Sequence, residues 1–310
     1  MFLSVVIPTY NRLPILEKCL RALESQRLAA PISNYEVVVV DDGSTDDTVA
    51  WLGRHQADLP HVRLVQQDHG GPAEGRNRGV DHARGDVIVF IDSDLVVTED
   101  FLLSHASQLN QSWQERGDRL CFTYGAVINT ANFEDPTSEP HKLRDLSWAY
   151  FATGNVAIDR EVLERSGLFD TRFRLYGWED LELGERLRQM GVVLVRCPAA
   201  VGYHWHPPLS LEQVPRLIAV EGERAKMGLV FYKKHPTRRV RFIIQFTILH
   251  RVLWELLTLG GLLNERSLRP LLAWLIRQGQ AAWAMELLRL PLNRIGVRAL
   301  YAEARAAGLR

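Results

Sequence analysis

The sequence predicts an α/β protein with a mostly parallel sheet and helices on both faces. Three short apolar runs carry the prediction, because each reads as a buried strand and each ends in a polar cluster: residues 4–7, 37–40 and 87–91. Helical spacing separates the runs, which is the rhythm of right-handed crossovers between parallel strands. Strand signals become rare after about residue 210, so we expect a second, helical region there.

The first hundred residues alternate strand and helix. After the first strand, Leu16, Leu20 and Leu23 recur at helical spacing, which predicts a helix over residues 13–26. A turn at residues 43–45 precedes a short helix with a Ser or Thr cap. In order, the remaining elements expected here are a helix over 46–54, a strand over 61–66, and a helix over 75–83 that feeds the strand at 87–91.

The next hundred residues continue the same alternation with longer connections. The stretch 130–140 is polar and rich in turn residues, so we expect a loop there. The elements expected are a helix over 101–114, strands over 120–129 and 154–158, a short helix over 160–166, a helix from 177 to 191, and a strand over 192–195.

The C-terminal third has helical stretches and is expected to form an extension. We therefore divide the chain into a core domain over residues 1–210 and a helical extension over 211–310. Residues 242–263 are strongly apolar, but Arg251 and Glu255 lie in the middle, which argues against a membrane span. Basic residues before this stretch and tryptophans within and after it fit docking at a membrane interface. A helical subdomain that covers the core or forms a homo-oligomer fits equally well.

Composition excludes some classes of protein. The 37 Lys and Arg balance the 37 Asp and Glu, and the pI is near 7.2, so a nucleic-acid-binding protein is disfavoured. The three cysteines form no CxxC pair and are expected to be reduced. The chain opens on a strand-like run without a basic segment or a cleavage site, so we expect a cytoplasmic protein or one at the inner face of the membrane.

Asp92, Ser93 and Asp94 form the most informative motif. They follow the apolar run 87–91, so two carboxylates lie at the carboxyl end of a strand. Ligands of open α/β sheets bind beyond these ends. Carboxylate oxygens suit a hard divalent cation that carries a diphosphate. The motif therefore predicts a shared site for a metal ion and a nucleotide.

Five motifs occur together in a familiar order. They are SVVIPTYNR at 4–12, VDDGSTD at 40–46, RNRG at 76–79, DSD at 92–94 and GWED at 177–180. The chain resembles a family 2 glycosyltransferase with the GT-A fold, over roughly residues 1–210. The resemblance implies inverting transfer of a sugar from a nucleoside diphosphate, with UDP first, to an acceptor hydroxyl of a glycan, a lipid-linked or a small molecule. It also implies Mn²⁺ or Mg²⁺ as cofactor and a role in polysaccharide or glycoconjugate synthesis.

The resemblance assigns a donor site to the carboxyl ends of the first strands. Within it, Asp42 is favoured over Asp41 for reading the base, and Arg76 over Arg78 for the diphosphate, because an Arg fork suits phosphate oxygens. Turn formation alone also explains several of these residue types. The complete donor set is Pro8, Thr9, Tyr10, Asn11, Asp41, Asp42, Gly71, Arg76, Asp92 and Ser93.

The same resemblance assigns the metal. Asp94 ligates it directly, and Asp92 lies nearer the ribose or reaches the metal through water. His204 completes the shell, since neutral imidazole is an ordinary ligand, and His206 is an alternative contact for the acceptor or a phosphate. The oxygen-rich shell disfavours zinc.

Catalysis is assigned to the start of a helix. Asp180 is the implied general base and Glu179 the residue that orients the acceptor, although acidic residues at this place also stabilise the helix dipole. Trp178, Gly154 and Asn155 are expected on the acceptor side.

Other readings remain open at this stage. They are a retaining transferase of the same fold, a nucleotidyltransferase, and a non-catalytic module that binds nucleotide sugars or glycans. A nucleotidyltransferase normally has a Gly-rich basic loop after the first strand, and a nicotinamide dehydrogenase has GxGxxG there. This chain has neither motif at that position.

Overall fold

The computed structural model describes residues 1–140 and 150–309. These residues form two compact units. The first contains residues 1–174 and 179–206, and the second contains residues 175–178 and 207–310. Each unit has its own apolar core, so each is described by itself.

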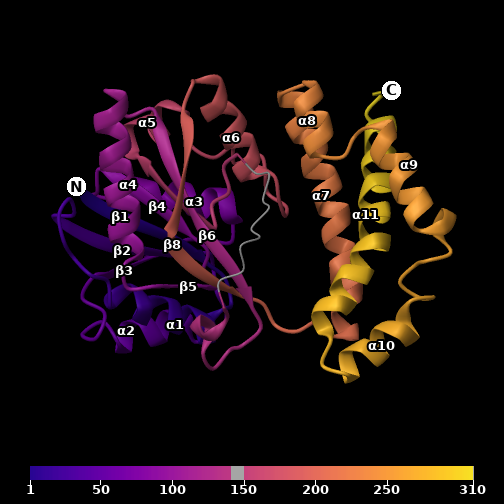
Figure 1. The fold of residues 1–310 in the computed structure, drawn as a ribbon, viewed down its shortest axis with the longest axis horizontal. Coiled ribbons are helices and arrows are strands. Elements are labelled where there is room, and N and C mark those ends of the chain that lie inside the picture. Colours follow the sequence, from indigo (N-terminus) through magenta and orange to yellow (C-terminus); the bar gives the residue numbers. More distant parts are fainter. Residues whose placement is uncertain (141–149, 310) are drawn as a thin grey trace. The chain divides into compact units, whose positions relative to one another are not determined.

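An eight-stranded mixed sheet forms the centre of the first unit (Figure 1). The strand order is β3-β2-β1-β4-β7-β6-β8-β5. The pairings β1–β2, β1–β4, β2–β3 and β6–β8 are parallel, and β4–β7, β6–β7 and β5–β8 are antiparallel. The α/β prediction is thus confirmed. The strands are β1 (Phe2–Thr9), β2 (Asn34–Asp41), β3 (Val62–Gln66), β4 (Val87–Ile91), β5 (Leu95–Val97), β6 (Cys121–Thr130), β7 (Asn155–Asp159) and β8 (Val193–Trp205).

Helices cover the sheet and set the position of its functional edge. In α3, Gly79 allows a close approach to β1, because a Cβ there would lie 2.3 Å from Cγ1 of Val6. This contact fixes the helix that carries Arg76 against the sheet. The helices of this unit are α1 (Leu13–Glu24), α2 (Thr48–Arg54), α3 (Pro72–His82), α4 (Phe101–Arg116), η1 (Pro136–Ser138), α5 (Arg160–Arg165) and α6 (Glu179–Gln189).

The end of the sheet differs from the sequence prediction. The strand expected over 192–195 extends to Trp205 as β8, and β5 was not expected at all. The polar and small residues after Val195, including Pro198, break the apolar pattern that would signal a strand. Here β8 pairs along β6 with an irregularity between Gly125 and Ala126, which accommodates the interruption. The longer strand brings His204 opposite Leu95 of β5.

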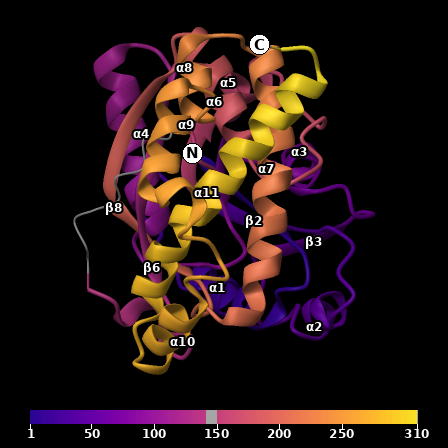
Figure 2. The same cartoon turned by 90° about the vertical axis from the view of Figure 1, so that its right-hand side faces the viewer.

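Helices build the second unit. A core that includes Leu209, Leu272 and Leu288 holds them together. The apolar stretch expected as one helical segment over 242–263 is broken, because Gln245 takes a positive φ of 61° and Thr247 caps a new helix. None of the described helices is long and apolar enough to cross a membrane. The helices are η2 (Leu211–Gln213), α7 (Val214–Lys234), α8 (Arg238–Ile243), α9 (Ile248–Leu257), η3 (Leu259–Gly261), α10 (Arg269–Arg277) and α11 (Ala281–Ala306) (Figure 2).

Candidate active site

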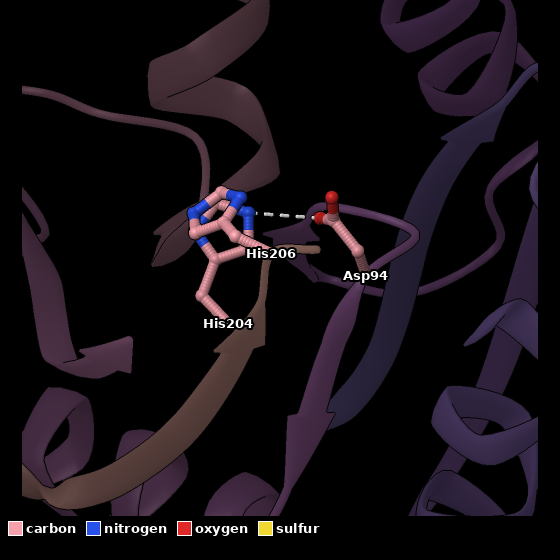
Figure 3. A group of neighbouring side chains, drawn as sticks. All are labelled: Asp94, His204 and His206. Atoms are coloured by element: carbon pink, nitrogen blue, oxygen red, sulfur yellow. Dashed lines mark ion pairs between the residues drawn. The ribbon is translucent and has the colours of Figure 1, made fainter. Parts of the chain in front are cut away.

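Asp94, His204 and His206 form a cluster suited to a metal ion (Figure 3). Each residue offers one ligand atom, and these atoms lie within 4.8 Å of one another. The Nε2 atom of His204 lies 2.9 Å from Oδ1 of Asp94. Asp94 is buried and His206 is exposed, so the cluster opens towards solvent on the histidine side.

Backbone pairing creates this cluster. Asp94 lies in the turn between β4 and β5, and β5 pairs antiparallel with the end of β8, with Leu95 opposite His204. The N–H of Trp205 donates to the carbonyl of Asp94 at 2.9 Å. Strand register therefore holds the carboxylate and both imidazoles together, although 110 positions separate Asp94 from His204 in the chain.

The cluster could supply part of the coordination shell of Mn²⁺ or Mg²⁺. One carboxylate and two imidazoles supply three ligands and leave positions for diphosphate oxygens. Burial, together with the nearby Arg12 guanidinium, lowers the pKa of His204, while Asp92 opposes the shift. The neutral imidazole favoured in this way is the form that binds a cation.

Arg76 connects two of the expected acidic residues. Its guanidinium, buried on α3, donates to Oε1 of Glu179 at 2.9 Å and to Oδ1 of Asp92 at 3.1 Å. The other oxygen of Glu179 is buried and has no hydrogen-bond partner among the described residues. A buried acceptor without a donor is costly, so this oxygen is available to a hydroxyl group of a ligand.

Asp180 has the electrostatic environment of a general base. Burial and the adjacent charge of Glu179 raise the pKa of Asp180 to about 7, while Arg76 and the N–H of Leu181 oppose the shift. That N–H donates to Oδ1 of Asp180 at 2.7 Å and orients the carboxyl group. A carboxyl group with a pKa near neutrality can both accept and release a proton at physiological pH.

The two clusters share one neighbour, Asp92. Its negative charge raises the pKa of Asp180 and that of His204 alike, although burial outweighs this effect at His204. Asp92 therefore lies within electrostatic reach of both the base and the metal ligands.

The edge formed by β1 and β2 has unsatisfied acceptors. In register, Thr9 lies opposite Asp41 at the carboxyl ends of these strands. Both residues are buried, and Oγ1 of Thr9 and Oδ1 of Asp41 find no partner in the described part of the chain. Tyr10 is more exposed and its ring lies 4.4 Å from that of His69. A planar base with N–H groups fits an aromatic ring beside free acceptors.

Asp42 is instead fully engaged by the loop before α3. Its oxygens accept from the N–H groups of Gly70 and Gly71 at 2.8 and 3.0 Å and from Nε2 of Gln67 at 2.7 Å. His69 lies 2.9 Å from it. The geometry thus favours Asp41 over Asp42 as the residue that reads the base, which reverses our preference from the sequence.

Four other expected donor residues have structural contacts. Oδ1 of Asn11, which has a φ of 51°, accepts from the N–H groups of Thr45 and Asp46 at 2.7 and 3.2 Å. Gly71 has a φ of 89°, a conformation that favours glycine, and Pro8 lies against Gly75. Ser93 is buried, and its carbonyl accepts from Cys19.

The residues expected on the acceptor side have different contacts. A Cβ on Gly154 would lie 3.3 Å from Oδ2 of Asp92, so Gly154 borders the site. The buried side chain of Asn155 instead bonds the carbonyls of Ala126 and Ala200, at 2.9 and 3.0 Å. Trp178 belongs to the second unit, where its indole N–H donates to the carbonyl of Arg224 at 2.8 Å.

Sequence reasoning missed two residues at the site. Arg12 contacts Oδ2 of Asp94, and His69 contacts both Asp42 and Tyr10. Arg12 ends the first motif, and its place after a strand end was a usable signal. His69 lies in the loop before α3, and its neighbours in sequence give no comparable signal.

Comparison with known proteins identifies the chain. The family model described as glycosyl transferase family 2 matches residues 4–167, which is more than half of the sequence. This chain belongs to that family. It is accordingly a glycosyltransferase, and the resemblance found from the five motifs is confirmed.

Relatives with known sequences share about a quarter of their residues with this chain. The uncharacterized glycosyltransferase YfnE of Bacillus subtilis is 27% identical over 263 residues, which cover 68% of this chain and 66% of YfnE. Chondroitin synthase of Pasteurella multocida is 27% identical over 290 residues, which cover 81% of this chain and 29% of the synthase. The chain thus spans less than two thirds of these relatives.

Solved structures share the fold. The mannosyltransferase PcManGT from Pyrobaculum calidifontis, in complex with GDP-Man and Mn²⁺, has a TM-score of 0.61 at 21% identity, over 97% of this chain and 86% of the other. S. aureus TarS 1–349 in complex with UDP-GlcNAc has a TM-score of 0.53 at 17% identity, over 100% of this chain and 93% of the other. The GT-A fold of family 2 glycosyltransferases is therefore present here.

Proposed function

We propose that this enzyme moves a sugar from a UDP-linked donor to an acceptor hydroxyl with inversion at the anomeric carbon, with a divalent cation as cofactor. The observation that carries the proposal is the common neighbourhood of Asp92. Arg76 binds Asp92 at 3.1 Å and Glu179 at 2.9 Å, so Asp92 lies close to the acidic pair of Glu179 and Asp180, and it stands two residues before Asp94 of the metal cluster. Inverting transfer needs a base and a stabilised leaving group at opposite sides of one sugar.

The proposed reaction is a single displacement at the anomeric carbon. The acceptor hydroxyl gives its proton to the carboxylate of Asp180, and its oxygen forms a bond to the anomeric carbon. The bond between that carbon and the diphosphate oxygen breaks, and its electron pair leaves with the nucleoside diphosphate. Glu179, held by Arg76, offers its unpartnered oxygen to a hydroxyl of the acceptor.

The leaving group is assigned to the other side of the site. Asp94, His204 and His206 would hold Mn²⁺ or Mg²⁺, which supplies Lewis-acid stabilisation of the departing diphosphate when it is bound. PcManGT in complex with GDP-Man and Mn²⁺ supports a metal and a nucleotide sugar together in this fold. Arg76 binds Asp92 and Glu179, and we propose that it holds these two carboxylates in place beside the diphosphate.

The nucleotide base of the donor is assigned to the carboxyl ends of β1 and β2. Tyr10 would stack on the base, with Asp41 and Thr9 as hydrogen-bond acceptors beside it. UDP-GlcNAc in TarS supports a uridine nucleotide, and the match to chondroitin synthase supports polysaccharide or glycoconjugate synthesis. We assign the donor chemistry to the domain over residues 1–210 and treat residues 211–310 as an extension.

Calorimetry tests the donor assignment. UDP, GDP and dTDP are titrated into the full chain with Mn²⁺, with Mg²⁺ and with EDTA. We expect UDP to bind only in the presence of a cation. Tighter binding of GDP or dTDP would change the donor, and equal binding in EDTA would remove the metal from the proposal.

Two variants test the division of roles. Asp94→Ala is expected to abolish transfer and metal-dependent UDP binding. Asp180→Asn is expected to abolish transfer but retain UDP binding, because Asp180 acts on the acceptor. Equal loss of UDP binding in both folded variants would contradict this division. The anomeric configuration of the product, read by NMR, would then distinguish inversion from retention.

A further inference from the structure

In the second unit, helix α9 exposes its apolar side chains to solvent. In α9, the six apolar residues that follow helical spacing all face solvent: Ile248, Leu249, Val252, Leu253, Leu256 and Leu257. We call this set the α9 apolar face. Ile248 is 76% exposed and Leu256 is 68% exposed. A surface helix of a globular protein normally turns its apolar stripe towards the core.

The opposite side of α9 packs through polar groups. Glu255 accepts from Arg294 at 3.0 Å and from Arg298 at 2.7 Å, and both arginines lie on α11. Arg251 lies over the ring of Tyr301, also on α11. Helices α9 and α11 run beside each other within this unit (Figure 2). The polar side of α9 is therefore used for packing, and no residue of this fully described helix is buried.

The apolar surface continues beyond α9. Leu259 and Leu262 follow the helix and are 61% and 73% exposed, and the ring of Phe242 contacts His250 while remaining 59% exposed. An exposed apolar surface of this extent on a soluble chain marks an interaction site. The question is which partner covers it.

Charge selects the partner. Residues 207–310 contain 17 Lys and Arg against 7 Asp and Glu, a net charge of +10, and the first 206 residues contain 20 against 30, a net charge of −10. The overall net charge of zero hides this division. Exposed arginines precede and follow the α9 apolar face, among them Arg238, Arg266 and Arg269. A second copy would bring two such positive surfaces together, which is unfavourable.

A cavity between α9 and α11 adds an anion site. It has a volume of ≈ 330 Å³ and is lined by Arg251, Arg298 and Arg305, together with Glu255, Val297 and Tyr301. Glu255 binds Arg298 at 2.7 Å, so we assign the anion to Arg251 and Arg305. The hydroxyl of Tyr301 is buried without a hydrogen-bond partner in the described residues. Guanidinium groups around a free hydroxyl donor fit the oxygens of a phosphate group.

We propose that the α9 apolar face docks onto an anionic lipid bilayer and that the arginine-lined cavity receives a lipid phosphate. Helix α9 is too short to span a bilayer, so it lies in the interface with its apolar side towards the acyl chains. The surrounding arginines contact anionic headgroups. The enzyme would then act at a membrane surface, where a lipid-linked acceptor is concentrated. The binding itself does not depend on the proposed sugar transfer.

Vesicle sedimentation of the full chain tests the proposal. Two vesicle compositions are compared, phosphatidylcholine alone and phosphatidylcholine with about one third phosphatidylglycerol. We expect the wild type to sediment preferentially with the anionic vesicles and to be released by salt. The variant Ile248→Asp/Leu256→Asp is expected to bind more than ~10-fold more weakly, since two inserted side chains are lost.

A matched control adds the same two negative charges outside the α9 apolar face. Ser107→Asp/Gln114→Asp places two carboxylates on exposed positions of α4 in the first unit, and we expect it to bind far more tightly than the α9 variant. Circular dichroism and the unfolding midpoint confirm that both variants are folded. The variant Arg251→Gln/Arg305→Gln is expected to lose the preference for phosphatidylglycerol while keeping its weaker binding to phosphatidylcholine.

Three results would overturn the proposal. The first is a wild type that sediments with neither vesicle. The second is equal binding by the α9 variant and its control. The third is a lipid-free dimer in analytical ultracentrifugation that Ile248→Asp/Leu256→Asp converts to monomer, because the face would then join two copies of the chain.

Discussion

Replacing Asp180 with Asn is expected to stabilise the protein while removing its activity. Burial and the charge of Glu179 raise the pKa of Asp180 from 3.8 to about 7. The folded state therefore holds a proton that the unfolded chain has already released between these two pH values. The contribution of Asp180 to stability is fully present below pH 3.8, is lost progressively between pH 3.8 and about 7, and stays constant above that, whereas Asn does not titrate.

The size of the effect follows from the two pKa values. Each pH unit between them corresponds to about 1.4 kcal/mol, so the ionised Asp180 costs the fold about 4 kcal/mol at pH 8 and less than about 2 kcal/mol at pH 5. The N–H of Leu181 keeps an acceptor in the variant, because Asn retains a side-chain oxygen. We expect Asp180→Asn to gain about 2–3 kcal/mol more at pH 8 than at pH 5, or about 5–10 °C in midpoint.

Thermal unfolding at both pH values measures this difference. Asp58→Asn provides the matched control, since it makes the same chemical change at an exposed position. We expect the control to shift the midpoint by the same small amount at pH 5 and pH 8. A midpoint difference for Asp180→Asn that is equal at the two pH values would refute the raised pKa, and with it the physical basis for Asp180 as base.

Three other predictions follow from the site and the sheet. The kcat/KM of the wild type is expected to fall about tenfold for each pH unit below 7, because Asp180 must be ionised to accept a proton, and a pH–rate profile checks this. Asp41→Asn is expected to weaken nucleotide binding about tenfold in calorimetry, whereas Asp42→Asn is expected to lower stability by about 2–3 kcal/mol in urea titration, since Asp42 holds the loop before α3. Gly79→Ala is expected to cost about 1–3 kcal/mol by the same titration, because its Cβ would lie 2.3 Å from Val6.

Much of the parallel part of the sheet could be predicted from the sequence. Residues 37–40 and 87–91 are continuous apolar runs, and such runs are what strands buried on both faces require. The motifs lie at the carboxyl ends of these strands, where Thr9 is opposite Asp41 in register. In this part of the chain, the apolar pattern of each run by itself indicates a buried strand.

The antiparallel end of the sheet could not be predicted in the same way. Here β5 has three residues, too few to show a period, and β8 contains Pro198 and small residues that resemble a loop. Their pairing depends on contacts between residues more than a hundred positions apart, and one sequence does not reveal such contacts. The metal cluster inherits this limit, because its histidines reach Asp94 only through that pairing.

Within the carboxylate pairs of the site, the two members have different tasks, and the motifs alone do not distinguish them. Asp42 accepts hydrogen bonds from a loop, which leaves Asp41 with a buried oxygen that has no partner among the described residues. Glu179 binds Arg76, which leaves Asp180 next to a fixed negative charge with a pKa near 7. In each pair the protein's donors are distributed unequally, because Asp42 binds the loop before α3 and Glu179 binds the guanidinium of Arg76. Both members are acidic in sequence, so the task of each follows from which protein donors reach it, and that is a property of the folded chain.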